Sequence, residues 1–223
     1  FITGRNKRAI EDHFDSNPEL ESELYSKGKS EQARMVRNIL PNGVECIFVR
    51  QASQLGLGHA ILCAERVVGD EPFAILLADD FLAHDGIGVT AELVKAYNKT
   101  GKSQLSIMPV DGPDISKYGV VKQAVNSNLV ESLVEKPSLK DAPSNLACIG
   151  RYVLNPDIFG ILHKQLIGVG GEIQLSDAIN VQAKSGSVES LMLSCQRFDC
   201  GSVSGYLKAI QHVAINVTSD KYD

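Results

Sequence analysis

Short β-rich runs alternate along this chain with longer segments in which apolar residues recur at helical spacing. Such runs, bounded by turn residues, predict strands at 44–50, 103–110, 118–121, 129–135, 147–154 and 188–193. The helical spacing predicts a pair of surface helices within 7–14 and 18–40, a helix through 64 and 67, helices at 88–97 and 157–164, a helix that ends at 184, and a last helix at 203–217. This order predicts one α/β domain over residues 1–223, with a Rossmann-like mixed, mostly parallel central sheet flanked by helices. The strands around 126–128 suggest a small antiparallel insertion.

The most apolar run, 73–80, begins after Pro72 and stops at two carboxylates, Asp79 and Asp80. A run without polar residues is typical of a parallel strand that is buried on both faces, so we expect it in the middle of the sheet. Ligands of such sheets bind beyond the carboxyl ends of the strands, which makes Asp79 or Asp80 a candidate for binding a metal or a hydroxyl group. The alternative is that the two acids simply begin a solvated loop.

A glycine-containing loop, 51–60, leads into the helix that continues through Val67. Glycines here allow the backbone to approach a flat ring or a phosphate closely, and N–H groups at a helix start favour acceptor atoms. Neither G-x-G-x-x-G nor G-x-x-x-x-G-K-[ST] occurs in the chain. We interpret His59 as a residue of the helix start rather than as a catalytic group.

Later segments supply further candidates. The strand at 129–135 delivers Glu135 and Lys136, which either form an exposed ion pair of little energetic value or point into a cleft and bind sugar hydroxyls and a phosphate. The helix that runs to Lys184 is expected to be capped by Ser176 or Glu172. Residues 198–201 are expected to form a turn.

Composition excludes several classes of function. The formal net charge is -5 and no basic cluster occurs, so we expect no nucleic-acid duplex and no anionic membrane as a partner. No apolar run approaches the roughly 18 residues of a membrane span, and nothing resembles a secretion signal, which favours a cytoplasmic protein. The five cysteines are odd in number and never take a C-x-x-C spacing, so we expect reduced, structural thiols and no zinc.

Seven ordered blocks give the chain a resemblance to the bacterial UTP–glucose-1-phosphate uridylyltransferases, among the sugar-1-phosphate nucleotidylyltransferases. Together they span most of the chain, which makes the resemblance far more specific than any single block. The blocks are 50–60 (with Leu55-Gly56-Leu57-Gly58-His59-Ala60), 77–80 (Leu77-Ala78-Asp79-Asp80), 118–121 (Tyr118-Gly119-Val120-Val121), 134–137 (Val134-Glu135-Lys136-Pro137), 145–154, 171–179 and 198–201 (Phe198-Asp199-Cys200-Gly201). The resemblance implies the fold of the nucleotide-diphospho-sugar transferase type.

The resemblance also implies roles for individual residues. Gln51 and the backbone at Gly56 would hold uracil, and Asp79 and Asp199 would share a Mg²⁺ ion.

On the sugar side, Gly119 and Glu135 would bind hydroxyl groups and Lys136 would neutralise the phosphate. Glu172 and Asp177 would either contact the sugar or hold the loop and helix together.

The implied reaction transfers the uridylyl group of UTP to glucose 1-phosphate and gives UDP-glucose and pyrophosphate. In-line attack of one phosphate on another needs positioning, a hard cation held by carboxylates and a lysine, but no covalent nucleophile. The resemblance further implies a homodimer or homotetramer.

One family feature is missing from the printed sequence. The family begins with a strand, a glycine-rich loop that binds the triphosphate, and a helix. We therefore expect that the domain is N-terminally incomplete and that the natural gene product carries this segment. Without it the chain would expose apolar core and aggregate.

Three other functions stay open. The chain could transfer a different nucleotide, as a sugar-1-phosphate thymidylyltransferase does, or it could be a non-catalytic nucleotide-sugar binding or regulatory module. A glycosyltransferase that uses Asp79 and Asp80 as its metal motif fits less well, because it explains neither Glu135 and Lys136 nor the glycine turn at 168–171.

Overall fold

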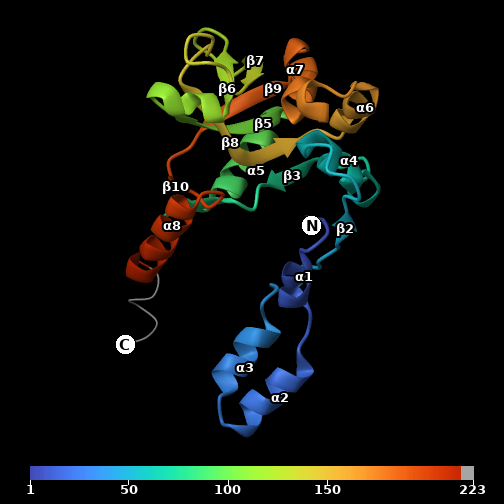
Figure 1. Ribbon diagram of the computed structural model, residues 1–223, viewed down its shortest axis with the longest axis vertical. Coiled ribbons are helices and arrows are strands. Elements are labelled where there is room, and N and C mark those ends of the chain that lie inside the picture. Colours follow the sequence, from blue (N-terminus) through green and yellow to red (C-terminus); the bar gives the residue numbers. More distant parts are fainter. Residues whose placement is uncertain (217–223) are drawn as a thin grey trace.

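The computed structural model describes residues 1–216, in which the long strand β8 (Leu146–Leu154) organises the main sheet (Figure 1). On one side β8 pairs antiparallel with β5 (Ser103–Pro109), and on the other it pairs antiparallel with β3 (Phe73–Leu76) and β6 (Gly119–Gln123). Beyond β5 lies the parallel edge strand β9 (Val188–Met192), and beyond β6 lies the antiparallel strand β7 (Val130–Glu135).

Alternate residues of β8 face two separate apolar cores, as the two-residue period of a strand dictates. Cys148, Tyr152 and Leu154 belong to the core that holds residues of helices α4 (Leu57–Val68), α6 (Asp157–Lys164) and α7 (Leu175–Lys184). Ala147, Ile149 and Val153 belong to the core that holds residues of α5 (Val89–Thr100) and of the short helix η1 (Gly112–Lys117). The sheet is therefore covered by helices on both faces.

Two smaller strand pairs extend from this body. β4 (Asp80–Ala83) pairs antiparallel with β10 (Gln196–Asp199), which leads into helix α8 (Val203–Asn216). β1 (Ile2–Thr3) pairs parallel with β2 (Val49–Arg50). Between them, α1 (Arg8–Phe14), α2 (Pro18–Ser26) and α3 (Ser30–Arg37) form an arm that projects away from the main sheet (Figure 1). A short turn of helix, η2 (Val169–Gly171), precedes α7.

The α/β class, the mixed sheet and the antiparallel insertion β6–β7 are confirmed, but the expectation of mostly parallel pairing is wrong. β3, β5, β6 and β9 do run in one direction. Because β8 is antiparallel to them and lies between β5 on one side and β3 and β6 on the other, most hydrogen-bonded pairs are antiparallel.

The interpretation of 73–80 as a central strand buried on both faces is also wrong. β3 ends at Leu76, and within the described residues it pairs only with β8. Phe73 and Ile75 are half-buried while Ala74 and Leu76 are exposed. The strand therefore has one covered face and one open edge.

Smaller expectations need correction as well. Residues 7–40 form three helices rather than two, and only Val49–Arg50 of the run 44–50 is strand. Neither Ser176 nor Glu172 caps α7, whose N-cap residue is Gln174. Phe198 and Asp199 end a strand, and only the next two residues turn. Residue 217, the expected end of the last helix, lies outside the described residues.

Two further observations concern the chain as a whole. Among residues 1–216, no helix has the length and apolar character needed to cross a bilayer. All five cysteines carry free thiols.

Candidate active site

A cavity of about 380 Å³ opens where the end of β3, the hairpin β6–β7, the start of α7 and the end of β10 meet. Its wall includes most of the residues that the sequence singled out. These are Asp79, Asp199, Gly119, Glu135, Lys136 and Glu172. Gln51 and Gly56 do not line it.

Asp79 and Asp199 approach each other across Gly201. A Cβ atom at Gly201 would lie 3.1 Å from Oδ1 of Asp199 and 3.2 Å from Oδ2 of Asp79. The backbone holds the two segments together, because the N–H of Cys200 donates to the carbonyl of Asp79 at 2.7 Å. Only glycine leaves this space open, so the turn after β10 keeps room between two carboxylates.

Asp80 has a different environment from its neighbour Asp79. Its carboxylate is buried and accepts a hydrogen bond from the N–H of Gly150 at 2.7 Å and one from Nε of Arg197 at 2.5 Å. Nη2 of Arg197 contacts the same carboxylate oxygen. Asp80 is thus occupied as an internal partner, whereas Asp79 is exposed at the cavity.

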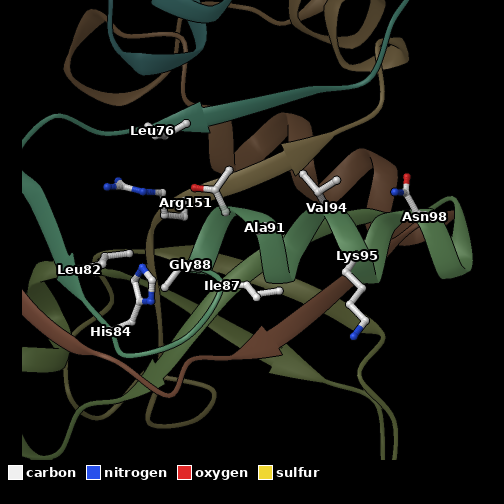
Figure 2. Close-up of a pocket in the computed structure, with 12 residues that line it drawn as sticks. Leu76, Leu82, His84, Ile87, Gly88, Ala91, Val94, Lys95, Asn98 and Arg151 are labelled. Carbon is white, nitrogen blue, oxygen red and sulfur yellow. The ribbon is translucent and has the colours of Figure 1, made fainter. Parts of the chain in front are cut away.

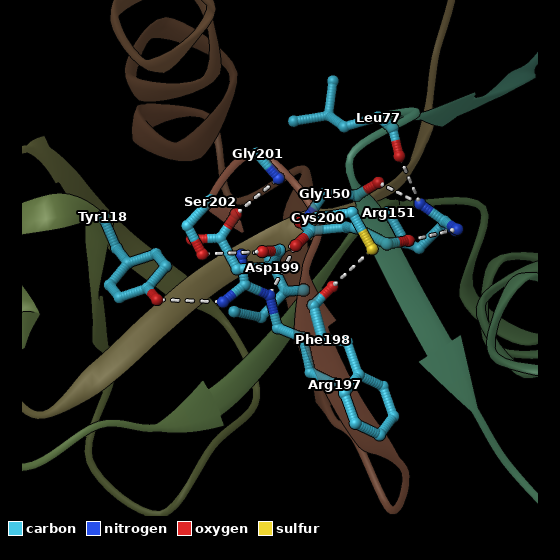
Figure 3. A network of polar contacts seen from close by, with 12 residues as sticks. Leu77, Tyr118, Gly150, Arg151, Arg197, Phe198, Asp199, Cys200, Gly201 and Ser202 are labelled. Carbon is cyan, nitrogen blue, oxygen red and sulfur yellow. Dashed lines mark hydrogen bonds and ion pairs between the residues drawn. The ribbon is translucent and has the colours of Figure 1, made fainter. Parts of the chain in front are cut away.

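Two arginines surround this buried carboxylate. Arg197 also donates to the hydroxyl of Tyr118 at 2.9 Å and lies over its ring, while Arg151 donates to the carbonyl oxygens of Leu77 and Asp80 (Figure 3). Burial lowers the pKa of Arg151. Burial acts in the same direction on Arg197, but pairing with Asp80 and Tyr118 outweighs it, so the pKa of Arg197 is raised. Both stay charged, so the segment 77–80 is fixed from two sides.

The hairpin β6–β7 places the sugar-side candidates. Gly119 lies opposite Glu135 in the register, and a Cβ at Gly119 would lie 3.2 Å from Oε2 of Glu135. Lys136 takes a φ of 45°, which is uncommon for a residue with a side chain, and its N–H donates to the carbonyl of Tyr118. Its ammonium group lies 3.8 Å from Oε1 of Glu135 and remains largely exposed at the cavity.

Glu172 and Asp177 separate in the structure. Glu172 lines the cavity and accepts a hydrogen bond from Nε2 of Gln174 at 2.9 Å. Asp177 lies outside the cavity wall and accepts a longer bond from Gln165. This geometry favours the role in holding the loop for Asp177.

Gln51 and Gly56 lie on a loop that is hydrogen-bonded to the segment that carries Glu172 in the cavity wall. A Cβ at Gly56 would lie only 2.8 Å from Cβ of Glu172, and Gly56 takes a φ of +91°. The N–H of Ile173 donates to the carbonyl of Leu55, and the N–H of Gly58 donates to the carbonyl of Ile173. The glycine-containing loop and the loop that carries Glu172 therefore form one backbone unit.

Several polar groups in the wall were not predicted as site residues. Burial raises the pKa of the Cys148 thiol to about 12 and that of the Tyr152 hydroxyl well above its usual value, so both stay neutral. The hydroxyl of Ser176 is buried and has no hydrogen-bond partner among residues 1–216. Arg197 and Tyr118 were missed too, because only the pairing of β4 with β10 brings Arg197 to Asp80.

A second, larger hollow lies between α5 and the strand β3 (Figure 2). Its volume is about 770 Å³, and it contains none of the predicted site residues. Leu76 and Arg151 lie on one side of it, Leu82 and His84 on another, and Ile87 and Val94 among the apolar side chains between them. We call it the apolar groove, since apolar side chains make up most of its surface.

Within residues 1–216 no three histidine, cysteine or acidic side chains converge in a way that could hold a metal ion by themselves. The pair Asp79 and Asp199 supplies only oxygen ligands. Such a pair suits a hard divalent cation that takes its remaining ligands from water and from the phosphates of a substrate.

The chain also matches known proteins. The profile of the family described as nucleotidyl transferase matches residues 3–215. A UTP–glucose-1-phosphate uridylyltransferase from Pseudomonas aeruginosa is 45% identical over 215 residues, which are 94% of this chain and 76% of that protein.

Solved structures agree with this match. A UTP-bound UGPase from Acinetobacter baumannii is 37% identical, with a TM-score of 0.84 over 97% of this chain and 77% of that one. A UDP-glucose pyrophosphorylase complexed with UDP-glucose is 40% identical, with a TM-score of 0.82 over 96% of this chain and 79% of that one.

Proposed function

Because the chain belongs to the nucleotidyl transferase family, we propose that it transfers the uridylyl group of UTP to glucose 1-phosphate and forms UDP-glucose and pyrophosphate. One observation carries the proposal. A single cavity holds an open carboxylate pair, Asp79 and Asp199, together with the cation of Lys136 and the carboxylate of Glu135. The names of relatives that are 41% to 45% identical to the chain support the choice of substrates.

The reaction joins two anions, so the residues of the site act by positioning and by neutralising charge. An oxygen of the sugar phosphate attacks the α-phosphorus of UTP, and the bond to pyrophosphate breaks as the new bond forms. Lys136 offsets the charge of the sugar phosphate, while Glu135 and the backbone at Gly119 orient the sugar hydroxyls. Gln51 and the backbone at Gly56 hold the uracil ring.

We assign Asp79 and Asp199 as ligands of Mg²⁺. The hard oxygen ligands and the incomplete protein coordination fit an ion that is bound through one or two carboxylates and substrate phosphates. When bound, Mg²⁺ would neutralise the charge that develops on the phosphate oxygens. Asp80 does not join them, because Arg197 and Gly150 already occupy its carboxylate.

No covalent intermediate is needed in this scheme. Cys148 and Tyr152 lie in the wall, and burial keeps both protonated. A neutral thiol is a weak nucleophile, so we infer direct transfer. We also propose a cytoplasmic location, since five unpaired thiols suit a reducing compartment.

The test measures pyrophosphate release from UTP and glucose 1-phosphate as a function of Mg²⁺, using the natural gene product that carries these residues. We expect Asp79→Asn to lower kcat by more than about 100-fold, because even indirect supports of a metal commonly cost 10- to 100-fold. Circular dichroism should show an unchanged fold.

The matched control is Asp85→Asn, which removes an exposed carboxylate outside the cavity wall and should leave the rate unchanged. Full activity of Asp79→Asn would remove the metal assignment. A preference for dTTP over UTP would replace uridylyl by thymidylyl transfer, and binding of UDP-glucose without turnover would replace the enzyme by a binding module.

A further inference from the structure

The side-chain amide of Gln51 is held at two points. Its Nε2 atom donates to the carbonyl oxygen of Gly56 at 3.1 Å and lies 3.0 Å from Nδ1 of His59. Gln51 directly follows β2, and His59 lies in the first turn of α4, next to the point where β2 approaches this helix (Figure 1). Both side chains are half-buried.

The proton positions follow from the chemistry of the three groups. A carbonyl oxygen only accepts, so the amide nitrogen of Gln51, and not its oxygen, must face Gly56. The other amide hydrogen then points to Nδ1 of His59, which must accept it. His59 therefore carries its proton on Nε2. With the amide reversed, its oxygen would face the carbonyl oxygen of Gly56, which is also an acceptor, and only a proton on Nδ1 of His59 could match it.

The neighbouring groups keep His59 in place. The N–H of Gly58 donates to the carbonyl of Ile173 at 2.9 Å, and the N–H of Ala60 donates to the carbonyl of Gly56 at 3.1 Å. The backbone on both sides of His59 is thus fixed before any ligand arrives. An acceptor on a fixed backbone can hold the amide of Gln51 in a single orientation.

We propose that His59 is a positioning residue that makes the site select uracil over cytosine. The inference rests on the proposed function, which places the base at Gln51 and Gly56. There the amide N–H and the carbonyl oxygen lie side by side as a donor next to an acceptor. Uracil presents the complement, the acceptor O4 beside the donor N3–H, whereas cytosine presents a donor amino group beside the acceptor N3.

Binding of uracil then replaces the hydrogen bond from Gln51 to Gly56 by two hydrogen bonds to the base. N3–H of uracil takes the place of the amide on the Gly56 oxygen, and O4 accepts from the amide of Gln51. Cytosine would set donor against donor and acceptor against acceptor. Only a reversed amide could serve cytosine's amino group, and His59 in its Nε2–H tautomer opposes that reversal because its Nδ1 atom offers no proton to the amide oxygen.

The geometry has a direct readout that does not depend on turnover. In protein labelled with ¹⁵N-histidine, long-range ¹H–¹⁵N spectra should report the Nε2–H tautomer for His59. When Gln51→Leu removes the donor, the same spectra should show that the His59 ring is no longer held in a single tautomer. A proton on Nδ1 would overturn the inference even if the enzyme is fully active.

The second readout is selectivity, as the ratio of kcat/KM for UTP to kcat/KM for CTP. His59→Leu should lower this ratio about tenfold, the effect of one lost hydrogen bond, mainly through a higher KM for UTP. The ratio of UTP to dTTP should stay constant, because thymine has the same O4 and N3–H edge. His59→Asn offers an oxygen acceptor near the Nδ1 position and should restore much of the UTP preference.

The matched control is His163→Leu, which removes a histidine that pairs with Glu65 on the surface and should change neither ratio. An unchanged UTP to CTP ratio in His59→Leu would overturn the inference. Equal losses for UTP, dTTP and CTP would also overturn it, since they would indicate general loosening. If the unsubstituted protein turns over no nucleotide, the proposed function fails. In that case the same nucleotide ratios, measured as binding constants for the unsubstituted protein and for His59→Leu, test the role of His59.

Discussion

Gly150 is the residue at which the main sheet touches the active-site segment most closely. Its N–H donates to Oδ2 of Asp80, and a Cβ at this position would collide with that oxygen and lie 2.7 Å from Cβ of Leu77. β8 can approach the segment 77–80 only because this residue has no side chain. The backbone of the central strand thus positions the residue next to Asp79.

We expect Gly150→Ala to lower the free energy of unfolding by about 1–3 kcal/mol, the usual cost of overpacking, and to reduce turnover by displacing the segment that carries Asp79. Chemical denaturation and the pyrophosphate assay measure the two effects. Gly160→Ala is the control. It lies in α6 with nothing within 4 Å of the added Cβ, and should stabilise the protein slightly. Equal behaviour of the two variants would contradict the tight contact.

At this scale the sequence predicted residue types better than their environments. The acids at 79–80 stood out as candidates, but their pattern could not decide between them. Asp80 is distinguished by Arg197, a residue 117 positions away that no sequence pattern singled out. Pairing across such a distance leaves no local trace in the sequence.

At the scale of elements, the short ladder β4–β10 depends on one buried ion pair. The side chain of Asp80 is 6% exposed and that of Arg197 is 13% exposed. The ladder also sets Asp199 opposite Asp80 in the register, which brings Asp199 towards Asp79. The ion pair therefore holds together the two strands whose ends carry the open carboxylates.

Removing one partner of a buried pair leaves an uncompensated charge, so we expect Arg197→Leu to destabilise the protein by about 3–5 kcal/mol. Urea unfolding measures this loss. Lys27→Leu breaks the exposed pair with Glu23 and should cost no more than about 0.5 kcal/mol. A similar small loss for Arg197→Leu would mean that Asp80 is protonated or hydrated instead of paired.

The identity of most elements could be predicted, but their order in the sheet could not. Short β-rich runs bounded by turn residues place β5, β6, β7 and β8 nearly where they occur. The same pattern cannot reveal that β8 lies between β3 and β5. The apolar run 73–80 therefore looked central, although its open edge leaves it half exposed.

At the scale of the whole molecule, this open edge lies beside the apolar groove on α5 (Figure 2). Leu76 of β3 is 55% exposed, and Ile87 on the other side of the groove is 66% exposed. An unpaired strand edge next to contiguous apolar surface is a site of self-association. We expect the 223-residue chain to associate through this face.

Leu76→Lys should reduce concentration-dependent association, because a charge on an edge strand opposes pairing with a second chain. Sedimentation velocity or light scattering over a concentration series measures it. Leu139→Lys adds the same charge at a leucine that is 56% exposed outside the groove, and should have little effect. Equal association of the two variants would show that the chain associates through another surface.

The contrasting surroundings of Asp79 and Asp80 also limit how the gene can change in length. Adding or removing one codon between Leu76 and Asp79 would shift both acids by one position relative to the end of β3. The acid that should face Asp199 would then meet Arg197, and its neighbour would lose its buried partner. Apolar substitutions in 73–78 should be tolerated far better than any insertion or deletion there. Variation in length among descendants of this gene should instead collect in surface segments such as 138–144.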